Sequence, residues 1–298
     1  MDDHLIGILS NIGMISFIAL SAYLLLIVGE ISFGQQAFFA IGAYAAGIAT
    51  AMWGWDFWPG LVWGAGIAAL AAVLVGIPTL RIRGLYFSIA TLAFAEMVRL
   101  VFEVFEYRVE IDGEMVGPDG SDGFRDIRYI FENDITAFEY MAMIYLLLAA
   151  VLAGFFLLER SRLGSIFRMI GQDHILAEMQ GLNVTLYKIL ALCLAGFVAG
   201  IGGALYAHLT TFVEPKIFNV MLGVHSLAYG LIGGLGTAFG PLIGVAIDIG
   251  FLESVQFISG YRMIAFGGLV AVLLIVRPRG LLDEAAVNRI RLLLRRHA

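Results

Sequence analysis

Runs of about 20 apolar residues recur along almost the whole chain, which is the length a helix needs to cross the hydrocarbon core of a bilayer. The chain is 60% hydrophobic and only 14% charged, whereas about a quarter of the residues in a soluble domain are charged. We therefore expect an all-α integral membrane protein, a polytopic bundle of about 8–10 transmembrane helices.

Nine candidate spans follow from these runs. The first begins at Leu5 and lacks a basic n-region and a cleavage site, so we expect a retained helix rather than a signal peptide. The seventh is short and rich in glycine, which predicts a tilted, broken or re-entrant helix, and the last two are tolerated where protein or a water-filled cavity satisfies the backbone. The spans are residues 5–28, 35–53, 60–79, 85–105, 138–158, 187–207, 224–237, 240–257 and 258–276.

The arginines predict the orientation. Three groups follow the third, fifth and last spans, and all fall on one side of the membrane, which the positive-inside rule assigns to the cytoplasm. The opposite side holds residues 106–134, where nine acidic residues face three arginines, a net charge of -6 that equals the net charge of the chain. We expect an external N-terminus and a cytoplasmic C-terminus. The three groups are Arg81 and Arg83; Arg160, Arg162 and Arg168; and Arg277, Arg279, Arg289, Arg291, Arg295 and Arg296.

The chain is expected to form one transmembrane domain, residues 1–280, followed by a cytoplasmic tail, residues 281–298. The domain carries an external loop, 106–134, and a cytoplasmic loop, 159–187, as its two longest connections. The tail mixes Leu and Ile with four arginines at helical spacing, which suits a basic amphipathic helix lying on the inner leaflet. The alternative is a simple stop-transfer anchor.

The sequence lacks the patterns of common catalytic sites. A P-loop needs Gly-Lys followed by Ser or Thr, but the two lysines, Lys188 and Lys216, follow Tyr and Pro. The five histidines are scattered, H-E-x-x-H and G-x-S-x-G are missing, and the single Cys193 excludes an intrachain disulfide. We expect a protein that is not an enzyme and has no cofactor, metal site or nucleic-acid partner. If ATP drives it, another subunit hydrolyses the ATP.

A few polar residues lie within or beside the apolar runs, where ionisable groups are costly and by default suggest function. Glu96 can instead be neutralised by Arg99, three residues on, while Asp248 and Glu253 can be interfacial. The pair Gln35 and Gln36 either lines a polar path for a small solute or caps the start of a helix. Candidates for a translocation path are Gln35, Gln36, Tyr44 and Glu96.

The stretch "GQDHILAEMQGLNVTLYK", residues 171–188, predicts a short capped helix in the cytoplasmic loop. Asp173 is a favourable N-cap, and Gly181 stands where a left-handed C-cap belongs. A helix of about two turns is marginal unless it packs on something. Its apolar residues share one face, so we expect a docking element for a cytoplasmic partner; the alternative is a surface helix resting on the bilayer. The coupling residues would be Asp173, Ile175, Leu176, Glu178, Met179 and Gly181.

Several stretches together carry a resemblance to a known family. They are "GEISFGQQAFFAIGAYAAG" (29–47), "LRIRGLYFSIATLAFAEMVR" (80–99), "GPDGSDGF" (117–124), "SRLGSIFRMIGQDHILAEMQGLNVTLYK" (161–188), "IGGLGTAFGPLIG" (232–244) and "RPRGLL" (277–282). In this order they resemble the permease subunits of branched-chain amino-acid ABC importers, of the LivM type. Of the general Glu-Ala-Ala-x-x-x-Gly permease motif the chain keeps Glu178 and Gly181, and its external loop has Gly-Pro-Asp-Gly where relatives more often have Thr-Gly-Gly.

The resemblance implies a multi-pass protein of the cell (inner) membrane that forms the translocation path for branched-chain amino acids or a similar small polar solute. Its implied partners are a second, LivH-like permease subunit, two cytoplasmic ATP-binding subunits, an external or periplasmic solute-binding protein and the lipid bilayer. An ABC permease for urea or short amides is an alternative. A stand-alone secondary transporter is another, although it would be expected to show inverted repeats and coupling carboxylates. A passive channel is the third.

Overall fold

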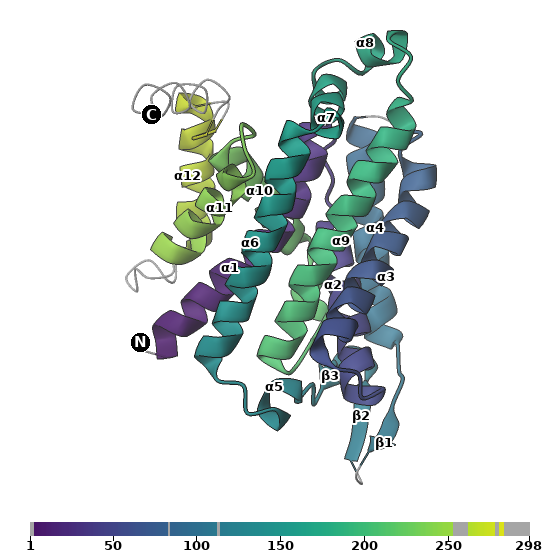
Figure 1. The fold of residues 1–298 in the computed structure, drawn as a ribbon, viewed down its shortest axis with the longest axis vertical. Helices are drawn as coiled ribbons and strands as arrows, with labels where there is room; N and C mark the ends of the chain where they lie inside the picture. Colours follow the sequence, from purple (N-terminus) through teal and green to yellow (C-terminus); the bar gives the residue numbers. More distant parts are fainter. Residues whose placement is uncertain (1–2, 83, 112–113, 253–261, 278–279, 283–298) are drawn as a thin grey trace.

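The structure is a computed structural model, and it describes residues 3–82, 84–111, 114–252, 262–277 and 280–282. It is a bundle of helices with a small sheet at one end (Figure 1). Five helices are long and apolar enough to cross a membrane, so the expectation of an all-α polytopic membrane protein is confirmed. They are α1 (Asp3–Ile27), α3 (Phe57–Thr79), α4 (Leu85–Val104), α6 (Ala137–Arg160) and α9 (Val184–Thr210).

The remaining predicted spans correspond to shorter helices. The helix α2 (Gln35–Gly47) continues into the π-helix η1 (Ile48–Met52), and α11 (Phe239–Val245) continues into the π-helix η4 (Ala246–Leu252). The other two are α10 (Val220–Gly233) and α12 (Arg262–Val276). Thus each of the nine predicted runs contains a helix among the described residues. Arg83, Glu253 and residues 283–298 of the predicted tail lie outside them.

The helix α9 lies at the centre of the bundle and packs against α1, α2 and α3. Glycine makes the closest of these contacts possible. A Cβ placed on Gly42 of α2 would lie 2.4 Å from the Cα of Gly200 on α9. Small residues at helix interfaces let backbones approach closely in a membrane, where packing rather than hydrophobic burial holds helices together.

Two helices, α2 and α10, begin inside the bundle rather than at its ends. Gln35, the first residue of α2, lies next to Ser21, whose Oγ is 2.9 Å from Gln35 Oε1 and 2.7 Å from the carbonyl oxygen of Ala195. Ala195 is about three turns into α9. The first turn of α10 lies beside that of α2, since a Cβ on Gly223 would meet Gln36 Oε1 at 2.2 Å.

The chain that leads into α2, residues 28–34, is not helical, yet its polar backbone atoms find partners. Ser88 Oγ donates to the carbonyl of Ile31 at 2.6 Å, and the backbone N–H of Phe33 donates to Thr91 Oγ1 at 3.1 Å. Irregular backbone at membrane depth is tolerated where neighbouring groups satisfy it in this way.

Loops 106–134 and 159–187 lie at opposite ends of the bundle (Figure 1), and we call these the outer and inner ends after the orientation that the arginines predict. The outer loop forms a small antiparallel sheet in the order β1-β2-β3, which the sequence analysis did not foresee. Its elements are β1 (Val109–Ile111), β2 (Glu114–Pro118), the 3-10 helix η2 (Gly120–Asp122), β3 (Phe124–Arg125) and α5 (Tyr129–Glu132). The inner loop forms α7 (Arg162–Gln172) and α8 (His174–Met179).

All four tryptophans of the chain gather near the outer end. Trp53, Trp55 and Trp63 form a ring cluster, with centroids 5.6 to 6.0 Å apart, and Trp58 lies at the start of α3. Their side chains are exposed, which suits a belt of aromatic rings at the boundary between lipid and water.

Candidate functional site

The helix α8 is capped at both ends, as the sequence analysis expected. The carboxylate of Asp173 accepts hydrogen bonds from the backbone N–H groups of Ile175, at 2.9 Å, and Leu176, at 3.1 Å. Gly181 follows the helix with φ +83, a conformation that side chains with a Cβ rarely adopt. The chain thus fixes where this helix of six residues begins and ends.

The apolar residues of α8 are exposed. The exposed fraction is 55% for Ile175, 50% for Leu176 and 80% for Met179, whereas Ala177 is buried against the protein. The helix lies at the far tip of the inner end (Figure 1). So short a helix depends on packing for its stability, and this chain packs only one of its faces.

The preceding helix, α7, holds α8 against the bundle. Ser161 caps α7 by accepting from the backbone N–H of Gly164 at 3.3 Å, and Phe167 and Ile170 are buried. At the other end of α7, a Cβ on Gly171 would lie 2.0 Å from the carbonyl oxygen of Ile27. The sequence analysis missed α7, although Ser161 followed by apolar residues at helical spacing was a usable signal.

A polar cluster joins α7 to three other parts of the inner end. Glu159 Oε1 accepts from Tyr23 Oη of α1 at 2.6 Å and from the backbone N–H of Ala238 at 2.9 Å. Arg168 of α7 lies 3.9 Å from the same oxygen and donates to the carbonyl of Gly236 at 3.0 Å. The cluster therefore ties α1, α6 and α7 to the turn between α10 and α11.

A buried ion pair makes a second connection. Lys188, in the first turns of α9, donates to the carboxylate of Glu30, in the segment that leads into α2. The exposed fractions are only 8% and 4%. Because α9 follows α8 directly, this pair links the inner loop to the start of α2. The sequence analysis considered Lys188 only as a P-loop candidate and missed the pairing, which joins residues far apart in the chain.

Three of the four candidate path residues lie on α2. Gln35 and Gln36 are 0% and 1% exposed, and Gln35 Nε2 and Gln36 Oε1 have no hydrogen-bond partner among the described residues. Buried polar atoms are rarely left unsatisfied. Tyr44, about two turns further along α2, is buried, and its ring stacks on Phe102 with centroids 4.0 Å apart.

The fourth candidate, Glu96, lies on α4 and pairs with Arg99, which also contacts Glu103. Glu96 Oε1 accepts from Arg99 Nε at 2.9 Å, and its side chain is 40% exposed. This matches the neutralising pair that the sequence analysis gave as an alternative. Asp248 is buried at 1% exposure rather than interfacial, and it accepts from Tyr229 Oη at 2.7 Å.

Known proteins similar to this chain are membrane transport components. A family model described as branched-chain amino acid transport system / permease component matches residues 4–277. The high-affinity branched-chain amino acid transport system permease protein LivM of Salmonella typhimurium is 29% identical over 299 residues, which cover 93% of this chain and 68% of its own. LivM of Escherichia coli gives the same identity and coverage. LivH of Escherichia coli is 26% identical over 163 residues, 54% of this chain and 52% of its own. No solved structure matches.

Proposed function

The chain belongs to the family of branched-chain amino acid transport permease components, and from that premise we propose that it forms a translocation path for branched-chain amino acids. It is a multi-pass permease subunit of an ABC importer in the cell (inner) membrane. The observation that carries this conclusion is the family match over residues 4–277. A similar small polar solute, urea or a short amide remains an alternative substrate.

The partners come from the same premise. The chain is similar to both LivM and LivH, which supports a second, LivH-like permease subunit beside it. Energy comes from two cytoplasmic ATP-binding subunits, since an importer without a P-loop of its own needs them. Solute reaches the outer end on a solute-binding protein.

The helix α8 docks on an ATP-binding subunit. Its exposed residues Ile175, Leu176 and Met179 supply an apolar contact, and its caps hold that contact in one shape. Asp173 and Gly181 therefore act as positioning residues, and Glu178 of the same helix would contribute a charge to the coupling element.

Motion of α8 reaches the interior by the two connections already described. The Glu159–Arg168 cluster carries it to the turn between α10 and α11, and the Lys188–Glu30 pair carries it to the start of α2. Contiguous packed networks with two arrangements are the physical means by which distant sites couple.

Gln35, Gln36 and Tyr44 face the path when it opens. The first turns of α2 and α10 meet at Gln36, so separation of these helices would expose two amides able to donate to a carboxylate and accept from an ammonium group. Glu96 stays a candidate because part of its side chain is exposed on α4. If Gln35→Leu and Gln36→Leu left uptake rate and substrate preference unchanged, both residues would be structural.

Reconstitution tests the function. The chain is incorporated into vesicles alone, with its LivH-like partner and ATP-binding subunits, and with all of these plus the solute-binding protein. We expect leucine uptake only in the complete set with ATP. Uptake by the chain alone, driven by an ion gradient, would support a secondary transporter instead. Preferred uptake of urea or acetamide by the complete set would replace the substrate while keeping the permease role.

A further inference from the structure

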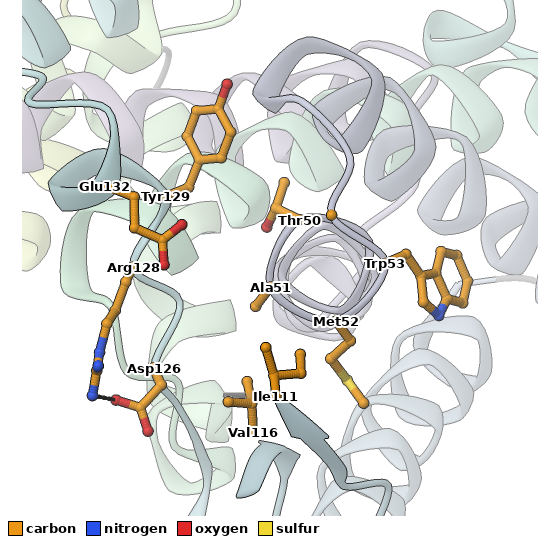
Figure 2. Close-up of a pocket in the computed structure, with 11 residues that line it drawn as sticks. Thr50, Ala51, Met52, Trp53, Ile111, Val116, Asp126, Arg128, Tyr129 and Glu132 are labelled. Carbon is orange, nitrogen blue, oxygen red and sulfur yellow. Dashed lines mark hydrogen bonds and ion pairs between the residues drawn. The ribbon is translucent and has the colours of Figure 1, made fainter. Parts of the chain in front are cut away.

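A cavity of about 610 Å³ opens at the outer end, between the π-helix η1, the β1–β2 hairpin and α5 (Figure 2). A π-helix is uncommon and often accompanies a functional site. Here η1 carries Thr50 at the cavity wall. The Thr50 side chain is held by a hydrogen bond, because its Oγ1 lies 3.0 Å from Nε2 of the buried His208. The cavity is lined by Thr50, Ala51, Met52, Trp53, Gly54, Ile111, Val116, Asp126, Arg128, Tyr129 and Glu132.

The charge of the lining is negative. Asp126 and Arg128 form an ion pair with 2.6 Å between Oδ1 and Nη2, so these two charges offset each other. The carboxylate of Glu132 points into the cavity (Figure 2), and it makes no hydrogen bond or ion pair with the described part of the chain. Among the described lining residues one carboxylate, that of Glu132, is therefore left without a cation, and it favours an occupant with a single positive charge.

The rest of the lining suits a long side chain with a charged tip. Met52, Ile111 and Val116 provide apolar surface for a methylene stem, as lysine and arginine require. Tyr129, three residues before Glu132 on α5, adds an aromatic ring to the lining, and aromatic faces attract guanidinium and ammonium groups. A zwitterionic amino acid fits less well, because Arg128 is the one cation among the described lining residues and Asp126 already pairs with it.

We propose that this cavity receives a lysine or arginine side chain of the solute-binding protein. The inference rests on the proposed function, which brings that protein to the outer end. Charge complementarity selects the occupant: the outer loop carries nine acidic residues against three arginines, so an approaching basic surface is attracted, and Glu132 fixes where one basic group comes to rest. Complementary charges at an interface steer encounter and fix register.

The test uses the assembled transporter in vesicles with its leucine-loaded solute-binding protein. ATP hydrolysis is measured against binding-protein concentration, and assembly is checked by co-purification of the ATP-binding subunits. We expect Glu132→Gln to raise the half-maximal concentration about tenfold, the effect of losing one close charge pair at an interface. Glu110→Gln is the matched control: it removes the same charge from β1, but next to Ile111 and on the opposite face of the strand. It should change the half-maximal concentration less than about twofold.

Charge reversal identifies the partner residue. Glu132→Arg should abolish stimulation, and one Lys→Glu or Arg→Glu variant of the binding protein should restore it. Equal effects of Glu132→Gln and Glu110→Gln would reduce the site to a general acidic field and overturn the inference. A wild-type half-maximal concentration for Glu132→Gln would also overturn it. The same holds if no Lys→Glu or Arg→Glu variant of the binding protein restores the stimulation lost in Glu132→Arg. If the binding protein fails to stimulate the wild-type transporter at all, the proposed function falls and this inference with it.

Discussion

The inner loop, residues 159–187, and the outer loop, residues 106–134, have the same length but present opposite chemistry. The inner loop exposes apolar side chains on a capped helix, whereas the outer loop, although it also exposes Phe131 and Met115, places carboxylates around a cavity. Exposed apolar surface is unfavourable in water, so it indicates an interaction site that a partner covers for most of the time. Charged surface is stable when uncovered and speeds the approach of a partner. The difference fits the proposed partners, an ATP-binding subunit that stays attached at the inner end and a binding protein that associates transiently at the outer end.

The ion pairs and side-chain polar contacts of the two loops differ in the same way. The inner loop is held by groups removed from water, including the Lys188–Glu30 pair and the Glu159 carboxylate. The outer loop contains more exposed pairs, such as Arg128–Asp126 with exposed fractions of 51% and 32%. We infer that the inner loop transmits the displacement of α8 to the bundle, while the outer loop mainly recognises the binding protein.

The largest expected effect follows from removing the left-handed glycine of the inner loop. Gly181→Val forces a β-branched residue to φ +83, where such residues are strained, and this should misplace α8. We expect normal abundance in the membrane, lost co-purification of the ATP-binding subunit and no ATP-dependent uptake. Gly154→Val is the control, because Gly154 lies in α6 with open space around it. A Gly181→Val variant that transports at the wild-type rate would remove α8 from the coupling mechanism.

The two lysines provide the next test, since one is buried and the other exposed. Lys188→Met leaves the Glu30 carboxylate buried without its partner, which should lower stability by about 3–5 kcal/mol. Lys216→Met breaks an exposed pair with Glu214, and surface pairs contribute about 0–1 kcal/mol. Thermal unfolding in detergent compares the two variants. In the double variant Glu30→Gln, Lys188→Met, stability should recover while uptake per ATP stays low. Similar unfolding temperatures for both single variants would contradict the contrast between buried and exposed pairs.

The features that could be predicted from the sequence are those that depend on residues close together in the chain. The spans and the caps of α8 depend on neighbouring residues, so Asp173 and Gly181 were readable from the chain alone. The Lys188–Glu30 and Glu159–Tyr23 contacts join residues more than 130 positions apart, and only the folded bundle brings them together. The strands β1 and β3 are too short to show an alternating pattern. The cavity exists only because β1 and β2 meet η1 and α5.

Salt concentration should affect the partner contacts of the two loops differently, so the comparison can be tested without any substitution. Raising the NaCl concentration from about 50 mM to about 500 mM screens exposed charges but leaves apolar contacts intact. We expect the half-maximal concentration of binding protein to rise several-fold, while the ATP-binding subunit stays bound to α8. Stimulation of ATP hydrolysis gives the half-maximal concentration of binding protein, and co-purification from the same samples gives the amount of ATP-binding subunit that stays bound. Loss of the ATP-binding subunit at high salt would mean that the inner contact is also mainly ionic.

The smallest effect is expected from substitution of the N-cap of α8. This substitution tests how much of the stability of the helix comes from the docked ATP-binding subunit. Asp173→Ala removes the acceptor for two backbone N–H groups and should weaken the helix by about 1 kcal/mol. The docked subunit also stabilises α8, so uptake should fall by no more than about fivefold. Asp173→Asn retains a capping oxygen and should stay near the wild-type rate. If Asp173→Asn loses as much uptake as Asp173→Ala, the carboxylate acts through its charge and not as a cap. If neither variant changes uptake, contact with the ATP-binding subunit alone sets the shape of α8, and the inner loop is less pre-organised than its caps indicate.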